Sequence, residues 1–488
     1  MTTFLSLEKM QAMVPGSRIV NASPEQAKKP IHRFSTDSRK IEQDDFFIAL
    51  VGEQFDGNTF ISNVMSKGAI GAIASKAEFV PQGFPALLVS DTIRAMQKIA
   101  SAWRHELNTT IIVVTGSNGK TTVKEMIASI LREAFGSKNV LATMGNLNNE
   151  IGLPLTLLGL QEHHQIAVIE LGMNHPGETS LLAKIAQPNI VLINNAQREH
   201  QEFMHTVEAV AREHADAIKE LLNNGVAVFP ADSEFTTIWK QVAKDKKYID
   251  FSLSNGQQEG VGKTYGVWVA DGTLDIYFKT SESNNENIKV KLNTLGDHNA
   301  KNAIAATSVA IAAQIGIRSI QKGLEKFIPV EGRMRTYQLP GLDNRSCLID
   351  DTYNANPDSV IAAIDVLAKL YGTKWLVLGD MGEVGDQGKE FHQEIGEYAQ
   401  KRGIDYLYAT GELSTYAIEG FNTSSQDKVG IRGVHFAEQK SLLKQLKSNL
   451  HDQEKNMNES IAVLVKGSRF TKMERIVQAL LKEESLCF

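Results

Sequence analysis

The sequence predicts an α/β protein of three domains. Its 488 residues exceed the roughly 250 to 300 residues that one hydrophobic core usually serves. From about residue 108 onward, short β-branched runs alternate with stretches of helical periodicity, which is typical of parallel sheets flanked by helices. The first hundred residues carry shorter apolar runs divided by Gly, Pro and Asp, which indicates a small α/β domain. We therefore expect domains at 1–106, 107–331 and 332–488.

In the second domain, strands are expected at 111–114, 166–171 and 189–194. Helices are expected from Lys120, over 207–222 and over 300–314. The polar segments 252–260 and 281–287 are typical of hairpin loops and predict a small antiparallel addition.

The third domain alternates in the same way, without a glycine-rich phosphate loop of its own, and is expected to be Rossmann-like. Its predicted strands are 346–351, 374–380, 405–410 and 461–467, and its predicted helices begin at Pro357, after Glu390 and at about Thr471. Asn356 before Pro357 predicts a helix start, because Asn caps helices and Pro suits the first helical position.

Composition excludes several classes of protein. Hydrophobic residues make up 42% and charged residues 22%, as in ordinary globular proteins. The net charge is −6 and the basic residues are dispersed, so neither nucleic acid nor an anionic membrane is an expected partner. Only two cysteines are present, and no apolar run reaches the roughly 18 residues of a membrane span. We expect a cytoplasmic protein without a transmembrane segment.

A phosphate-binding loop is predicted where VVTGSNGKTT, residues 113–122, joins a strand to a helix. Glycines allow backbone N–H groups to turn toward phosphate oxygens, Lys120 supplies positive charge, and Thr121 supplies a hydroxyl for Mg²⁺. The spacing G-x-x-G-K-T is two residues shorter than the common motif. We predict an ATP site, although the loop alone leaves a GTPase, a transporter motor, a kinase or a ligase open.

Two further side chains are expected at the same edge of the sheet. Glu170 ends one predicted strand and is a candidate ligand for Mg²⁺, directly or through water; the alternative is that it caps a neighbouring backbone group. His200 follows the next strand, but hard cations prefer oxygen, so by itself it would be a surface loop residue.

Six motifs occur in the order and approximate spacing of one family. They are VTGSNGKTT, GNLNNEIGLPLTLL (145–158), IELGMNHPGE ending at Glu178, LGDHNAKNAIAA (295–306), EGRMR (331–335) and DDTYNANPDS (350–359). The chain thereby resembles the Mur ligase family over nearly its full length, from TDSRK at 36–40 to VLVKGSRF at 463–470. TYNANPDS is the most type-specific part and resembles the branch of the family that adds D-alanyl-D-alanine.

The resemblance implies an ATP-dependent amide ligase of peptidoglycan synthesis. Such an enzyme joins D-alanyl-D-alanine to a UDP-N-acetylmuramoyl tripeptide through an acyl phosphate and releases ADP and phosphate. The N-terminal domain would bind the uridine nucleotide, the central domain ATP and Mg²⁺, and the C-terminal domain the dipeptide. We expect a cytoplasmic monomer with these substrates as its partners.

The resemblance also implies roles for individual residues. The catalytic group would be Lys120, Glu170, His200 and Arg333. Nucleotide would be bound by Thr115, Gly116, Ser117, Asn118, Gly119, Lys120, Thr121, Asn299, Asn302 and Asp351. The metal would be bound by Thr121, Glu170 and His200, with His214 as a candidate at a fourth position, where its imidazole could bind the metal or hydrogen-bond to a metal-bound water. The other substrates would be bound by Asp37, Ser38, Arg39, Asn149, Asn354 and Asn356, with the turn at 467–469.

One position departs from the family pattern. Most members place a carbamylated lysine, an anionic metal ligand, fourteen residues after the metal-binding histidine, where this chain has His214. Imidazole cannot supply the charge of a carbamate, so a second metal site is in question. Arg212 would point elsewhere on a helix, and Glu213 or Asp216 are candidates to compensate, although helix geometry puts neither on the face of His214.

Two other functions remain open from the sequence. One is a ligase similar to folylpolyglutamate synthetase, which shares the loop and the metal residues. The other is a regulatory P-loop protein in which nucleotide hydrolysis drives a conformational switch.

Overall fold

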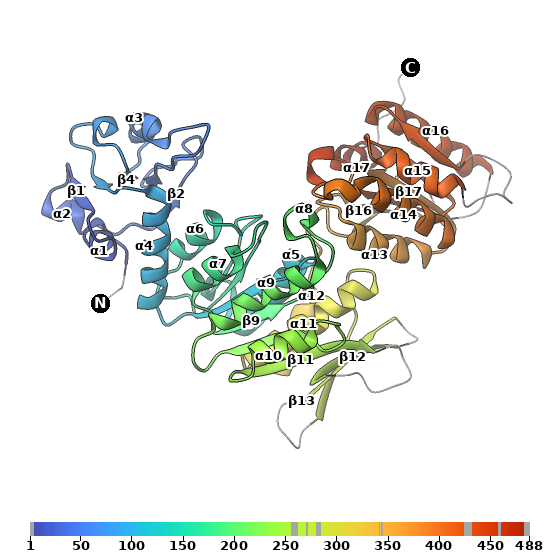
Figure 1. Cartoon of the computed structure of the whole chain (residues 1–488), viewed down its shortest axis with the longest axis horizontal. Coiled ribbons are helices and arrows are strands. Elements are labelled where there is room, and N and C mark those ends of the chain that lie inside the picture. Colours follow the sequence, from blue (N-terminus) through green and yellow to red (C-terminus); the bar gives the residue numbers. More distant parts are fainter. Residues whose placement is uncertain are drawn as a thin grey trace.

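The computed structural model describes residues 4–254, 262–269, 272–279, 285–340, 342, 345–423, 432–456 and 460–482. Each of three sheets lies in its own part of the chain, with helices packed around it (Figure 1). The N-terminal and C-terminal parts lie at opposite ends of the view, with the central part between them (Figure 1). The three-domain α/β architecture is confirmed, while the boundaries at 106/107 and 331/332 stay a prediction.

The N-terminal sheet is small, with strand order β1-β5-β4-β3-β2 and only β1 antiparallel to its neighbour. Its strands are Arg18–Val20, Phe34–Ser35, Phe46–Ile48, Gly71–Ala74 and Ala86–Leu88. Its helices α1 to α4 are Leu7–Met13, Pro24–Ala27, Ile61–Ser66 and Thr92–Glu106. The amphipathic helix α4 leads into the central domain (Figure 1), and its buried face belongs to a core that runs from the first domain into the second.

The central sheet has the order β14-β13-β12-β11-β10-β9-β6-β8-β7. Its strands β6 to β14 are Thr110–Thr115, Val140–Ala142, Ile166–Glu170, Ile190–Ile193, Val226–Pro230, Lys247–Ser254, Thr264–Trp268, Leu274–Lys279 and Asn285–Val290. Its helices α5 to α12 are Lys120–Phe135, Gly152–Leu158, Glu178–Ala186, Gln201–Met204, Val207–Lys219, Thr236–Val242, Asp297–Ala312 and Ile317–Lys326. Neighbouring strands from β7 through β8, β6, β9, β10 and β11 to β12 are parallel. Strands β12, β13 and β14 are antiparallel to one another, so the predicted antiparallel addition is confirmed.

The predicted central elements are found with small shifts at their ends. The helix predicted over 207–222 ends at Lys219, and the one predicted over 300–314 begins three residues earlier, at Asp297. Of the two predicted loop segments, residues 255–260 and 281–284 lie outside the described residues.

Strand β6 shows why the phosphate loop has a fixed position. Alternate side chains enter two different cores, with Ile111 and Val113 on one face and Ile112 and Val114 on the other. Helix α5 packs on the second face with α11 and α12, while α7 and α9 belong to the first. The strand is therefore held on both faces up to Thr115, where the loop begins.

The C-terminal sheet has the order β15-β16-β20-β17-β18-β19, parallel except for the edge strand β15. Its strands β15 to β20 are Arg335–Gln338, Cys347–Asp351, Thr373–Gly379, Tyr406–Thr410, Gly433–Phe436 and Ile461–Lys466. Its helices α13 to α17 are Pro357–Ala368, Gly388–Lys401, Ser414–Thr423, Gln439–Asn456 and Glu474–Leu481. Helix α13 begins as predicted, with a capping box between Asn356 and Ser359.

Among the helices in the described ranges, none combines the length and the apolar character that crossing a membrane requires.

Candidate active site

The loop after β6 forms an anion-binding turn at the start of α5. Gly116 and Gly119 have φ angles of +133° and +75°, which only glycine adopts without strain. A Cβ on Gly119 would also lie 2.8 Å from Asn302 Oδ1. No side chain caps the N-terminus of α5, and the Lys120 ammonium donates to the carbonyl oxygens of Gly116 and Ser117. The free N–H groups and the lysine are the features that bind a phosphate group.

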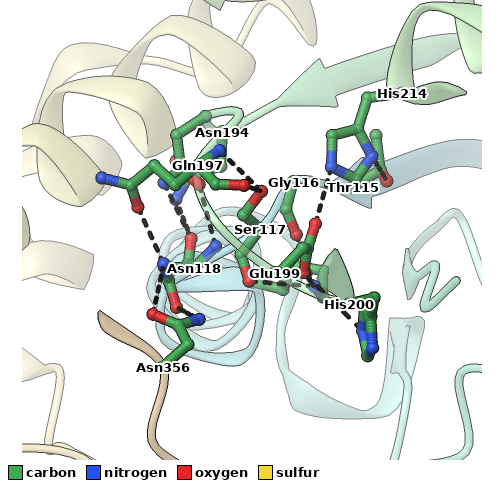
Figure 2. A network of polar contacts seen from close by, with 12 residues as sticks. Thr115, Gly116, Ser117, Asn118, Asn194, Gln197, Glu199, His200, His214 and Asn356 are labelled. Atoms are coloured by element: carbon green, nitrogen blue, oxygen red, sulfur yellow. Dashed lines mark hydrogen bonds and ion pairs between the residues drawn. The ribbon is translucent and has the colours of Figure 1, made fainter. Parts of the chain in front are cut away.

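The segment after β9, residues 194–200, holds this loop in place (Figure 2). Asn195 Oδ1 accepts from Asn118 N at 2.8 Å, and the side-chain amides of Asn194 and Asn195 donate to Asn118 O at 2.8 and 2.9 Å. Gln197 N donates to Ser117 Oγ at 2.9 Å. Three asparagine contacts therefore hold the loop backbone, and two contacts of Gln197 hold the side chains of Ser117 and Asn118.

Glu170, the last residue of β8, and Thr121 meet beside the loop. Thr121 Oγ1 donates to Glu170 Oε2 at 2.9 Å, and Asn148 Nδ2 donates to Glu170 Oε1 at 2.9 Å. The Glu170 residue is only 2% exposed, yet no basic side chain in the described part of the chain forms an ion pair with it. A buried carboxylate without a paired cation is a candidate ligand for one.

Glu199 is a buried acidic residue that the sequence reasoning missed. Its Oε1 lies 3.0 Å from His214 Nε2, and its Oε2 lies 3.4 Å from Lys120 Nζ and 3.9 Å from His200 Nε2 (Figure 2). Burial alone would raise the pKa of Glu199, but the nearby Lys120 ammonium and the contact with His214 outweigh burial and hold that pKa well below its usual range. Its position directly before His200 was the signal available in the sequence.

His214 is fully buried, and both of its ring nitrogens have partners. Nδ1 lies 2.9 Å from Thr115 Oγ1, and Nε2 faces Glu199. Among the alternatives raised from the sequence, Glu213 accepts from the backbone N–H groups at the start of α7, and Asp216 forms an ion pair with Lys219. Arg212 pairs with Glu208 on the exposed side of α9, away from the site as expected. The carboxylate in contact with His214 is therefore that of Glu199, not of Glu213 or Asp216.

A cavity of about 740 Å³ lies between the central and C-terminal domains. It gathers most of the predicted site residues from both domains. These are Ser117, Asn118, Gly119, Lys120, Thr121, Asn149, Glu170, His200, Asn299, Asn302, Arg333, Asp351, Asn354 and Asn356. Thr115, Gly116 and His214 support this cavity from behind without lining it.

Arg333 lies where the chain enters the C-terminal domain. Its guanidinium stacks over the Tyr353 ring at 4.0 Å, and its buried Nε has no hydrogen-bond partner. Arg333 also lines the cavity, where a guanidinium group can bind an anionic ligand. Asp351, which the family resemblance places at the ribose, forms an ion pair with Lys466 at 2.5 Å.

Two asparagines of α11 connect the far end of the cavity to the phosphate loop. Asn299 Oδ1 accepts from Asn302 Nδ2 at 3.1 Å, and Asn302 Oδ1 accepts from Asn194 Nδ2 at 2.9 Å. Asn194 in turn donates to the loop carbonyl of Asn118. The predicted adenine-side residues are thus in one hydrogen-bonded chain with the predicted phosphate-side residues.

Several polar contacts cross from the central to the C-terminal domain. The side chains of Asn118 and Asn356 exchange hydrogen bonds of 2.8 and 3.3 Å (Figure 2). Arg198 donates to Asp358 at 2.7 and 3.0 Å and to Glu394 at 2.8 and 3.2 Å. His200 Nδ1 lies 2.8 Å from Glu383 Oε2. The phosphate loop is therefore in direct contact with the third domain through Asn118.

The structure does not bring all the predicted substrate residues together. Asp37 and Arg39 form an ion pair of 2.8 Å on the N-terminal domain and, with Ser38, are not among the cavity-lining residues. Asn149 lines the cavity, but its Oδ1 also accepts from Gly152 N at the start of α6. The roles assigned to these residues stay predictions.

Fold and site together define a P-loop nucleotide-binding protein whose cleft is closed by a Rossmann-like third domain. Three family models match it, described as the Mur ligase family catalytic domain over 30–109, the Mur ligase middle domain over 114–310, and the Mur ligase glutamate ligase domain over 332–469. The chain belongs to the Mur ligase family.

Individual relatives agree with this assignment. The UDP-N-acetylmuramoyl-tripeptide–D-alanyl-D-alanine ligase of Buchnera aphidicola subsp. Baizongia pistaciae is 36% identical over 93% of this chain and 93% of its own. A crystal structure of MurF from Acinetobacter baumannii has a TM-score of 0.84 at 32% identity, covering 98% of this chain and 99% of that one. MurF from Thermotoga maritima in complex with ADP has a TM-score of 0.74 at 26% identity, covering 92% and 97%.

Folylpolyglutamate synthase of Mycobacterium tuberculosis complexed with ADP is similar in fold alone, with a TM-score of 0.60 at 14% identity. It covers 80% of this chain and 94% of its own. The alternative reading of the sequence as that kind of ligase is therefore the weaker one.

Proposed function

We propose that the chain is an ATP-dependent ligase that joins D-alanyl-D-alanine to a UDP-N-acetylmuramoyl tripeptide. The relatives that match it over nearly their whole length bear that activity in their names. The observation that carries the proposal is the single cavity in which Lys120 and Glu170 of the central domain face Arg333 and Asn356 of the C-terminal domain. A site shared by two domains suits a reaction whose substrates arrive separately.

The central domain would bind the triphosphate. The N–H groups at the start of α5 and the Lys120 ammonium would neutralise phosphate charge. The hydrogen-bonded amides from Asn299 to Asn118 would lie along the bound nucleotide. In the reaction, the tripeptide carboxylate takes the terminal phosphoryl group to give an acyl phosphate and ADP. The dipeptide amine then attacks the acyl carbon, forms the amide, loses a proton and displaces phosphate. Positioning and charge neutralisation supply most of the catalysis.

Mg²⁺ fits the residues present. Glu170 is buried without a basic partner in the described residues, and Thr121 Oγ1 lies 2.9 Å from it, so two hard oxygen donors lie beside the phosphate loop. Among the described residues, no three His, Cys, Asp or Glu side chains form a metal site by themselves. When bound, Mg²⁺ would screen the phosphate charge. His200 is predicted to line this site.

The C-terminal domain would complete the site and exclude water. Arg333, which lines the cavity, would pair its guanidinium with the negative charge of the phosphates. Asn354 and Asn356 would lie near the incoming dipeptide, and Asp351 near the ribose. Water exclusion matters because an acyl phosphate hydrolyses readily. Asp37, Ser38 and Arg39 would serve the uridine nucleotide on the N-terminal domain.

All the proposed cavity residues come from one chain, so we propose that a monomer in the cytoplasm, where ATP is supplied, is the active form. Phosphate release from ATP tests the function. Release is expected only when the UDP-linked tripeptide and D-alanyl-D-alanine are both present, together with a new amide-linked product by mass spectrometry. Release driven by a folate with glutamate, or by a protein partner without either substrate, would replace this function with one of the alternatives.

A further inference from the structure

The two oxygens of Glu199 have different surroundings. Oε1 accepts from His214 Nε2 at 3.0 Å, on the side away from the cavity. Oε2 lies 3.4 Å from Lys120 Nζ and 3.9 Å from His200 Nε2, and Glu199 itself lines the cavity. One oxygen is therefore anchored, and the other faces the place where the phosphates are proposed to bind.

His214 fixes the direction of this carboxylate. An ionised carboxylate can only accept hydrogen bonds, so His214 Nε2 carries the proton in their contact. The other nitrogen, Nδ1, is occupied by Thr115 Oγ1 at 2.9 Å, and the residue is 0% exposed. His214 cannot bind a cation without breaking one of these two contacts. Its role is to position Glu199 from behind, which the sequence alone did not reveal.

Binding of a triphosphate must change the charge balance around Glu199. The Lys120 ammonium now lies between Glu199 and the carbonyl oxygens of the phosphate loop. Phosphate oxygens will compete for this ammonium, leaving Oε2 as a buried negative charge beside further negative charges. Such a charge is strongly destabilised unless a cation replaces the lysine. A divalent cation that arrives with the nucleotide would do so, since carboxylate oxygens are preferred ligands of hard cations.

We propose that Glu199 exchanges Lys120 for a divalent cation when the nucleotide binds, and that its Oε2 is a second protein carboxylate, besides Glu170, in contact with the cations of the site. This inference rests on the proposed nucleotide site. It gives the chain, through an unmodified glutamate held by His214, the negative charge that the family resemblance places on a modified lysine at position 214.

Mn²⁺ binding to the full chain, followed by electron paramagnetic resonance in the presence of a non-hydrolysable ATP analogue, tests the exchange. Glu199→Gln removes the charge and keeps the shape, and is expected to weaken Mn²⁺ binding at least about tenfold, the loss typical of altered metal sites. The same variant should bind the analogue without metal equally well or more tightly, because a negative charge beside the phosphates has gone. A general loss of structure would weaken both.

Glu213→Gln is the matched control. Glu213 is as buried as Glu199, at 7% against 6%, and lies next to His214, but its oxygens accept from Gly177 N and Thr179 N, and it does not line the cavity. Its variant should bind Mn²⁺ as the unaltered protein does. Glu199→Asp, which keeps the charge at a shorter reach, should lose less Mn²⁺ affinity than Glu199→Gln.

Unchanged Mn²⁺ affinity in Glu199→Gln would overturn the proposal. Equal losses of Mn²⁺ affinity in Glu199→Gln and Glu199→Asp would overturn it too. So would a lack of Mn²⁺ binding by the unaltered protein in the presence of the analogue. Weaker binding of the metal-free analogue alone would show that Glu199 only positions Lys120, and would also overturn it. The titration needs nucleotide but neither of the other substrates. A protein that failed the two-substrate phosphate assay would therefore lose the proposed ligase function while the Mn²⁺ result still decided the role of Glu199.

Discussion

The two walls of the cavity differ in how far their polar groups are already held. On the central wall, Thr121 with Glu170 and Glu199 with His214 are joined inside one domain, and the loop backbone is fixed by residues 194–197. On the C-terminal wall, Arg333 Nε is unpaired, and the wall is linked to the other domain by a few side-chain contacts. The polar groups of the central wall are thus already in place, whereas the position of the C-terminal wall depends on how closely the two domains approach each other.

This difference separates two kinds of substitution. Changes on the central wall should affect nucleotide and metal binding together with catalysis. Changes in the contacts between the domains should leave nucleotide binding alone and affect the step in which the third domain contributes. Four predictions, in order of decreasing effect, examine that separation.

Replacing the lysine of the phosphate loop should have the largest effect. Lys120→Met removes the ammonium now bonded to the loop carbonyls, and the loss of one charge-stabilising group typically costs about 10³-fold in kcat. Phosphate release from ATP in the presence of the UDP-linked tripeptide and D-alanyl-D-alanine measures this loss of kcat. Lys138→Met, at an exposed lysine after α5, is the control and should be unaffected. Less than a tenfold loss in Lys120→Met would mean that the phosphates bind elsewhere.

Removing Arg198 should weaken the approach of the third domain. Arg198→Ala breaks the side-chain ion pairs with Asp358 and Glu394, which are partly exposed and worth up to about 1 kcal/mol each. We expect about a tenfold lower kcat/KM for the dipeptide, since a factor of ten corresponds to about 1.4 kcal/mol. Affinity for the ATP analogue should stay the same.

The control for Arg198 is Arg212→Ala, which breaks an exposed ion pair within α9 and touches no second domain. Arg212→Ala should change neither kcat/KM for the dipeptide nor the affinity for the ATP analogue. If Arg198→Ala weakened nucleotide binding as much as dipeptide use, the division between the two walls would be wrong.

The parts of this site that the sequence predicted are those with local causes. The phosphate loop could be located because a β-branched strand, two glycines and a helix start are contiguous at 110–122. Glu170 could be placed because it ends a strand of a parallel sheet, where side chains meet at one edge. Asn356 was recognised as a helix cap because Pro357 follows it directly, and the structure adds the capping box with Ser359.

The parts that could not be predicted depend on contacts between distant segments. Glu199 reaches Lys120 and His214 only because β9 lies next to β6 and α9 packs under the same edge. From the sequence, the candidates for a charge to replace the family's modified lysine were the helix neighbours of His214, namely Glu213 and Asp216. In the structure, both of these side chains have other partners. The pairing of Asn118 with Asn356, which are 238 residues apart, is likewise invisible before folding.

Asn356 combines a local and a long-range role that two substitutions can separate. Asn356→Ala removes both the helix cap and the link to Asn118, and should destabilise the protein by about 1 kcal/mol in thermal or urea unfolding. Asn356→Ser keeps a capping hydroxyl but is too short to reach Asn118, so stability should hardly change. Its kcat/KM for the dipeptide should fall about fivefold, since the two partly buried hydrogen bonds to Asn118 together contribute about 1 kcal/mol. Equal stability losses in both variants would show that the cap does not depend on the side-chain oxygen as described.

The smallest effect is expected at an exposed link between the domains, where Lys369 Nζ lies 2.8 Å from Asp297 Oδ2 with both side chains more than half exposed. Burial would raise the pKa of Asp297, but the contact with Lys369 prevails and lowers it from its ordinary value of 3.8. A carboxyl group whose pKa is lower in the folded state contributes stability above pH 3.8 and loses it as the pH falls through the lowered pKa. Because solvent screens the pair, we expect at most about 0.5 kcal/mol.

Unfolding of the unaltered protein and of Asp297→Asn, compared by urea titration from pH 6 to pH 3, measures this contribution. The variant keeps an oxygen for the Trp268 N–H that now donates to Asp297, so the difference reports the charge. The difference should be constant down to about pH 4, vanish at lower pH and shrink with added salt, since an exposed ion pair is screened. A difference that grew on acidification would contradict the direction of the pKa shift. A difference of several kcal/mol would mean that this exposed link, and not the buried polar contacts near the phosphate loop, governs how the two domains are held together.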